Sequence, residues 1–192
     1  MSITVSKLQI ALGADASGVQ STLTNLSLEA DTQTQPGLWQ LLQGVVRSIV
    51  ESAQFWTHAG ASSRTFDSPN EAQTFFDLLS TEERSKFSAE TLTNIDGCIA
   101  QTLPPLVEDR GTPAYIVVTL LLGIAGDWRG WDGVGDESAL SHSGLKRILE
   151  TLTRMPPEDL MVLELLWSPQ TAADSLSAEE MEAEYRDLKP LV

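Results

Sequence analysis

The chain has 192 residues, 42% of them hydrophobic, and is long enough to bury a substantial core. Its 27 acidic and 12 basic residues give a formal net charge of -15. We therefore do not expect it to bind nucleic acid or anionic lipid, because both require Lys and Arg, whereas a basic protein partner or a divalent cation stays compatible.

The first part of the chain alternates between strand and helix patterns. Ile3–Leu12 has hydrophobic residues at alternate positions, which predicts a strand. Apolar residues then recur every three or four positions over Gly18–Ala30, which predicts a helix. Asp31–Pro36 is rich in turn residues, and Gly37–Ala53 carries an apolar stripe wide enough for a deeply buried helix. Phe55–Phe66 has few helix signals and suggests only a short strand.

Two helix-capping patterns follow, each with Ser at the start and Glu three residues later. These patterns, Ser68–Glu71 and Ser80–Glu83, predict two consecutive helices that meet at Leu79–Ser80. In the second helix, Glu82 and Lys86 stand four positions apart, with the acid first, and are therefore expected to form an ion pair.

The middle of the chain contains one strongly apolar segment between two loops. We expect a short turn at Ser88–Leu92 and a loop at Leu103–Pro113, which is rich in proline. Ala114–Ala125 is apolar on both alternating sets of positions, which predicts a central strand covered on both faces, or on one face with the other in an interface. Gly126–Ser138 is predicted to be a loop.

The last third predicts a helix, a strand and a second helix. Ser143–Met155 is amphipathic, and the two prolines that follow it end the helix. Leu160–Trp167 is predicted to be a second buried strand, and Leu176–Glu180 begins a short acidic helix with a solvated face.

Strand and helical blocks alternate, but only the last two strands are joined by a single helix. We therefore predict an α+β fold, in which residues 1–192 form a single-domain sandwich of a small mixed sheet covered by helices. The sheet should have about three to four strands, and a doubly wound sheet is the alternative.

No segment has the features of a targeting or membrane-spanning sequence. The N-terminal residues lack the composition of a signal or transit peptide, and the longest apolar run, Tyr115–Leu122, is too short to cross a membrane. Cys98 has no second cysteine to pair with, which fits a reducing compartment, and we interpret it as a small buried hydrophobe. We expect a soluble, cytoplasmic protein.

The residue types needed for catalysis or metal binding are scarce. His58 and His142 are the only histidines, and Ser141–Ser143 fits a helix cap better than a nucleophile with its base. Two histidines and one cysteine are too few for a structural zinc site. We therefore predict no catalytic residue, no metal and no cofactor.

The loop after the central strand holds the most distinctive side chains. Its aspartates, Asp127, Asp132 and Asp136, lie four or five residues apart, and Glu137 follows directly, which does not match a calcium loop. We favour a solvated loop with its acids beside Arg129 over a cation site. Trp128 and Trp131 must either fold back onto the core or contact a partner.

Glu164 is a charged residue inside an otherwise apolar predicted strand. It must be paired, protonated or part of a pocket lining, and pairing with Lys or Arg is the commonest outcome. The candidate partner-binding residues are thus Trp128, Arg129, Trp131, Asp132 and Glu164.

Several segments are similar to one protein family and occur in the same order. The most specific are Thr81–Phe87 (TEERSKF) and Leu166–Gln170 (LWSPQ). The others are Lys7–Leu12, Glu29–Thr34, Ala114–Leu120, Asp174–Ser177 and Tyr185–Leu188. Together they resemble the domain-of-unknown-function 1517 family of cyanobacteria and chloroplasts.

The resemblance implies a protein of photosynthetic cells, in the cyanobacterial cytosol or on the stromal side of a chloroplast. Peripheral association with a thylakoid is the alternative. No catalytic residue is carried over from the family. Some members have an added apolar anchor, which this sequence lacks, and its 126–138 loop differs from the Pro-containing loop typical of the family.

We therefore predict a non-enzymatic regulatory, scaffold or assembly-type protein that binds another protein, for which a component of the photosynthetic apparatus is a candidate. The alternative is a domain that binds a small molecule or a divalent cation through the 126–138 loop or a pocket near Glu164. An unrecognised enzymatic activity is the third hypothesis.

Overall fold

The computed structural model describes residues 2–16, 18–86, 92–95, 98–101, 115–129, 141–170 and 175–192. These residues form a five-stranded sheet, a two-stranded hairpin and α-helices, as the α+β prediction requires. In chain order the elements are β1 (Ile3–Gly13), α1 (Gly18–Glu29), α2 (Gln35–Glu51), β2 (Trp56–Phe66), α3 (Pro69–Ser85), β3 (Leu92–Ile95), β4 (Cys98–Gln101), β5 (Tyr115–Ala125), α4 (His142–Arg154), β6 (Leu160–Ser168), α5 (Ala178–Glu184) and β7 (Lys189–Pro190).

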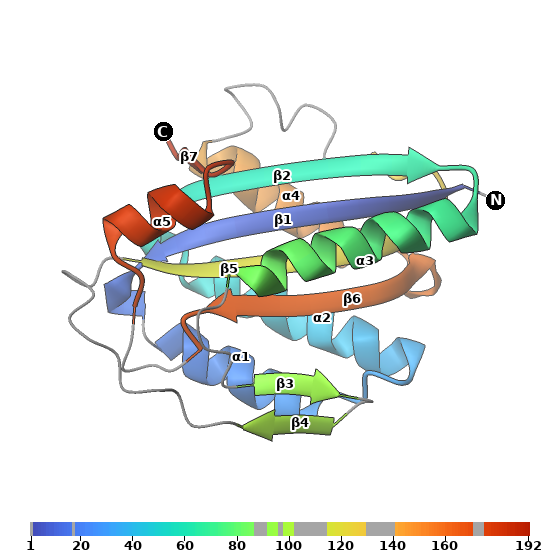
Figure 1. The fold of residues 1–192 in the computed structure, drawn as a ribbon, viewed down its shortest axis with the longest axis horizontal. Coiled ribbons are helices and arrows are strands. Elements are labelled where there is room, and N and C mark those ends of the chain that lie inside the picture. Colours follow the sequence, from blue (N-terminus) through green and yellow to red (C-terminus); the bar gives the residue numbers. More distant parts are fainter. Residues whose placement is uncertain are drawn as a thin grey trace.

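The main sheet has the strand order β6-β5-β1-β2-β7, with β1 at its centre (Figure 1). All four pairings between neighbouring strands are antiparallel. The predicted mixed sheet of about three to four strands is therefore wrong in both respects, and so is the doubly wound alternative. The last two long strands, β5 and β6, are antiparallel neighbours even though α4 lies between them in the sequence.

Two strands account for the undercount. The expected short strand in Phe55–Phe66 is an eleven-residue strand, β2, which pairs with β1 from Trp56 to Phe66. Residues 62–65 are exposed and polar, so this part of β2 has no hydrophobic alternation to reveal it. The other strand, β7, is only two residues long and pairs with His58 and Ala59.

Helices cover both faces of the sheet (Figure 1). Helices α1, α2 and α4 pack on one face, where they form the largest core cluster with Leu8, Ile10 and Leu12 of β1. On the other face, α3 packs over one end of the sheet and α5 over the other, against Val5 and Ala11 respectively. The alternation of side chains along β1 thus serves two cores, because the strand is buried on both sides.

Most of the predicted helix boundaries agree with the structure. Thr34 caps α2 by accepting a hydrogen bond from the Gly37 N–H, and Ser177 and Glu180 form a capping box on α5. The two helices predicted to meet at Leu79–Ser80 are, however, the single helix α3. Between residues 70 and 85 the sequence has neither Gly nor Pro, so nothing interrupts the helix at Ser80.

The strong strand predictions are confirmed as β5 and β6, although β6 is an edge strand on which Met161 and Val162 are exposed. The predicted loop at Leu103–Pro113 and the side chain of Cys98 lie outside the described residues. The predicted turn at Ser88–Leu92 lies outside them as well, apart from Leu92 at the start of β3. Within the described ranges, no helix combines the length and the apolar composition needed to cross a membrane.

Candidate functional site

The start of the loop after β5 is tied to the N-terminal strand. Gly126 has a φ of 87°, which favours glycine, and its N–H donates to the Ser2 carbonyl at 2.8 Å. The Thr4 hydroxyl donates to the Gly126 carbonyl at 2.8 Å and accepts from the Trp128 N–H at 2.9 Å. The Trp128 side chain is half-buried and packs against the largest core cluster. Of the two alternatives for Trp128, the structure shows the fold back onto the core.

Arg129 pairs with an acid of the same loop, as predicted. Its Nη2 lies 2.9 Å from Asp127 Oδ2, and the Thr65 hydroxyl donates to the other oxygen at 3.2 Å. The hydrogen bonds from Arg129 hold the pKa of Asp127 below its ordinary value. Trp131 and Asp132 lie outside the described residues.

The cation-binding alternative depends largely on acids that also lie outside the described residues, Asp136 and Glu137 among them. Among the described residues, no group of three or more His, Cys, Asp or Glu side chains is arranged to hold a metal ion. The cation site in the loop therefore stays a prediction.

Glu164 has the commonest of its predicted environments, an ion pair. It lies opposite Leu121 on the face of the sheet that α3 covers. The Arg84 Nε of α3 donates to Glu164 Oε1 at 2.7 Å, and the Arg84 Nη2 contacts the same oxygen. Because this carboxylate is occupied by Arg84, it serves to hold α3 to the edge strand β6.

A second charged group on the same face was missed by sequence reasoning. Glu83 of α3 is 1% exposed and accepts hydrogen bonds from Lys7 Nζ at 2.9 Å and from Gln9 Nε2 at 2.8 Å. Lys86 Nζ lies 2.8 Å from both oxygens of Glu83, and Gln9 also donates to the Thr119 hydroxyl. We call these five residues the Glu83 cluster.

The Glu83 cluster fixes the end of α3 over the centre of the sheet. It also reaches the C-terminal segment, because Lys86 Nζ lies 4.8 Å from the centre of the Tyr185 ring. The predicted ion pair between Glu82 and Lys86 is wrong, since Lys86 turns to the buried Glu83 instead. The available signal was Lys7, which shares its parity in β1 with the buried Ile3 and Val5.

His58 Nδ1 lies 3.0 Å from the neighbouring Thr57 hydroxyl, but that hydroxyl donates its proton to the Ala11 carbonyl at 3.1 Å and so does not offer it to the imidazole. Ser141 caps α4 by accepting from the Gly144 N–H, as the helix-cap interpretation predicted. The His142 ring stacks on Trp56 at 6.1 Å between ring centres. His58 stands edge-on to Tyr115, and burial lowers its pKa, which favours the neutral ring.

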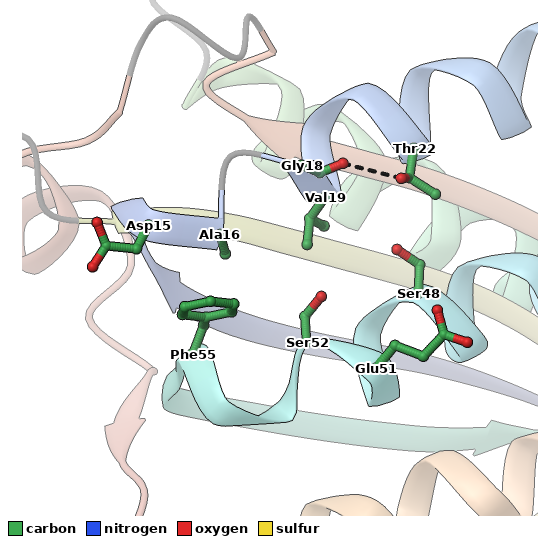
Figure 2. Close-up of a pocket in the computed structure, with 9 residues that line it drawn as sticks. All are labelled: Asp15, Ala16, Gly18, Val19, Thr22, Ser48, Glu51, Ser52 and Phe55. Atoms are coloured by element: carbon green, nitrogen blue, oxygen red, sulfur yellow. Dashed lines mark hydrogen bonds between the residues drawn. The ribbon is translucent and has the colours of Figure 1, made fainter.

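Two surface cavities lie on opposite faces of the sheet. The first, of about 380 Å³, lies between α5 and the sheet and is lined in part by His58, Tyr115 and Arg186. The second, the α1–α2 pocket, has a volume of about 330 Å³. Its lining residues are Asp15, Ala16, Gly18, Val19, Thr22, Ser48, Glu51, Ser52 and Phe55 (Figure 2). Glu164 lines neither cavity.

The α1–α2 pocket combines hydroxyl, carboxylate and apolar groups. The Ser48 and Ser52 hydroxyls point into the cavity, Val19 and Phe55 supply apolar walls, and the Glu51 carboxylate lies on the side of Ser48 (Figure 2). The Thr22 hydroxyl is used within α1, where it donates to the Gly18 carbonyl at 3.0 Å. No sequence motif marks this pocket, because it is assembled from two separate segments, residues 15–22 and residues 48–55.

Two proteins of photosynthetic organisms are similar to almost the whole chain. The first, "Protein FLAP1 homolog A" of Synechocystis, is 30% identical over 96% of this chain and 56% of its own length. The second, "FLUCTUATING-LIGHT-ACCLIMATION protein 1, chloroplastic" of Arabidopsis thaliana, is 30% identical over 97% of this chain and 46% of its own length. The chain thus spans about half the length of these relatives.

No solved structure matches the chain significantly. A family model matches residues 2–191, which is nearly the full length and includes every segment on which the resemblance was based. The chain therefore belongs to the family described as "Protein of unknown function (DUF1517)".

Proposed function

We propose that this chain is a non-enzymatic regulatory protein of a photosynthetic cell that acts in acclimation to changing light by binding another protein. The observation that carries the proposal is the similarity to two relatives across almost the whole chain, one of which is named for acclimation to fluctuating light. Because the chain spans about half of each relative, the proposed role is that of the shared region.

The charge of the chain supports a partner with a basic surface. A formal net charge of -15 creates a negative field that accelerates association with cationic surfaces and opposes association with anionic ones. The candidate contacts remain at the 126–138 loop. Arg129 has 69% of its side chain exposed, and Trp131 is the second tryptophan of that loop.

The biological test replaces the relative by this chain in a cyanobacterium. We expect this chain to restore parental chlorophyll fluorescence under fluctuating light in Synechocystis cells that lack their FLAP1 homolog, with little effect in constant light. Equal fluorescence with and without the chain, in a strain where the deletion itself has an effect, would contradict the proposed role.

The binding test is affinity capture of the tagged chain from the same cells. We expect a specific protein partner, and we expect Trp131→Ala or Arg129→Ala to reduce its recovery. Arg154→Ala is the matched control, because Arg154 is also an exposed arginine, at 78%, and pairs with the nearby Glu150. Unchanged recovery with both loop variants would exclude the loop as the contact surface.

A further inference from the structure

The α1–α2 pocket contains a mostly buried serine whose hydroxyl faces the cavity. Ser48 is only 9% exposed, and its hydroxyl makes no hydrogen bond to any described residue. A serine within a helix can donate to the carbonyl four residues earlier, as Thr22 does in α1. The Ser48 hydroxyl points into the cavity instead (Figure 2). Because this oxygen faces the cavity and is not engaged by the protein, it can donate to or accept from a polar ligand there.

The charges around the cavity determine the sign of that ligand. Asp15 and Glu51 are both exposed acids at its rim, and none of its described lining residues is basic. Neither carboxylate has an ion-pair partner within the described ranges. The C-terminal end of α2 adds negative partial charge, which opposes the positive partial charge at the N-terminal end of α1, at Gly18. The net field therefore favours a cation and repels an anion.

The apolar walls determine the shape of the ligand. Val19 and Ala16 are almost fully buried beneath the cavity, and the half-buried Phe55 closes one side (Figure 2). An aliphatic chain can pack on these walls while its charged end reaches Ser48, Ser52 and Glu51. A volume of about 330 Å³ is at the small end of the range for ligand sites. A hard metal ion binds oxygen ligands and would make no favourable contact with the apolar walls.

We propose that the α1–α2 pocket binds an alkylguanidinium or alkylammonium group, with Ser48, Ser52 and Glu51 as the polar contacts and Val19 and Phe55 as the apolar ones. Such a group is available from an arginine or lysine side chain of another protein, or from a free small amine. The proposal follows from the cavity alone and is independent of the proposed role in light acclimation.

The test is an NMR titration of the full chain, isotopically labelled, with butylguanidinium and butylammonium chloride. We expect saturable shifts of the amides of Ser48, Ser52 and Gly18, and at least tenfold weaker binding of the neutral butyramide. Binding of butyramide with equal affinity would overturn the proposal, and so would the absence of saturable shifts at these amides.

Variants separate the pocket from the general negative field. Ser48→Ala and Glu51→Gln should each weaken butylguanidinium about fivefold, by loss of a hydrogen bond and of an ion pair. Ser48→Ala removes no internal hydrogen bond, so its folding should be intact. Glu29→Gln is the matched control, because it removes an equally exposed charge at the far end of α1. If Glu29→Gln weakens binding as much as Glu51→Gln, the pocket is not the site.

The same titration identifies the source of the cation. A short Gly/Ser peptide with one arginine is compared with free butylguanidinium on the same chain. Tighter binding of the peptide supports a partner's side chain as the occupant, and tighter binding of the free cation supports a small amine; both results uphold the site. Displacement of neither probe by the other would show separate sites and overturn the proposal.

Discussion

Glu83 brings a negative charge to a position on α3 where its side chain is 1% exposed. Two ammonium groups and the Gln9 amide occupy its oxygens, so the cost of burying the charge is offset by three polar partners. Glu83→Gln keeps the shape but leaves Lys7 and Lys86 without their common anion. We expect the free energy of unfolding to fall by about 3–5 kcal/mol, measured by urea denaturation.

The neighbouring residue provides the control for this prediction. Glu82 is exposed and lies on the same turn of α3, so Glu82→Gln removes the same charge from the chain without disturbing the cluster. We expect a change of about 0.5 kcal/mol or less. Similar losses for the two variants would mean that the Glu83 cluster contributes little to stability.

Tyr185, next to the Glu83 cluster, makes the stability of the chain depend on alkaline pH. Burial raises the pKa of its phenol, with the negative charge of Glu83 acting in the same direction. The folded chain therefore keeps this proton above about pH 10, where the unfolded chain loses it, so the phenol's contribution to stability decreases as pH rises through that range. We expect Tyr185→Phe to flatten the decline of the unfolding free energy between about pH 9.5 and 11.5. An unchanged slope, by urea denaturation at several pH values, would contradict a buried phenol.

At the scale of elements, the start of α2 depends on the absence of a side chain at Gly37. A Cβ at this position would lie 1.9 Å from the Asp31 carbonyl oxygen, which belongs to the turn before the helix. Gly37→Ala must therefore move that turn, and we expect a loss of about 1–3 kcal/mol in urea denaturation. Gly18→Ala is the control, because a Cβ there meets nothing within 4 Å. Equal effects would show that helix propensity, and not the clash, decides.

The elements that sequence reasoning found are those whose periodicity is enforced by burial. β5 and α4 each keep one hydrophobic pattern along their whole length, because each is packed against the core from end to end. The full length of β2 was not predicted because its second half is exposed and polar. The break predicted in α3 rested on Ser80, which lies inside a helix that packing holds continuous. The strand directions could not be predicted, because they depend on how α1 and α2 lead the chain from β1 to β2.

The candidate residues show the same limit. Glu164 was identifiable because a charge in an apolar strand must be compensated, and Arg84 compensates it. The partner itself could not be named, because it comes from a helix eighty residues away. Ser48 could not be predicted as a site residue, because serines are common in amphipathic helices. Only the structure shows that its hydroxyl faces a cavity and makes no hydrogen bond to a described residue of the protein.

At the scale of the whole molecule, the formal net charge of -15 opposes compaction. Salt screens this repulsion over the longer distances between surface acids, whereas a buried pair such as Lys7 and Glu83, 2.9 Å apart, is screened much less. We therefore expect sodium chloride between about 0.02 and 0.5 M to raise the Tm by about 2–4 °C, equivalent to about 1 kcal/mol. Differential scanning calorimetry measures this shift.

Potassium chloride provides the control, because general screening predicts the same curve for both salts, whereas a bound sodium ion would separate them. A fall of the Tm with salt would mean that exposed ion pairs outweigh the repulsion between acids.

The same screening should weaken binding of a cationic ligand or a basic partner, because that attraction acts across exposed surface. Stability and binding are thus expected to respond to salt with opposite signs. If a partner dissociates at high salt while the Tm of the chain rises, the cause is weakened electrostatic attraction and not unfolding.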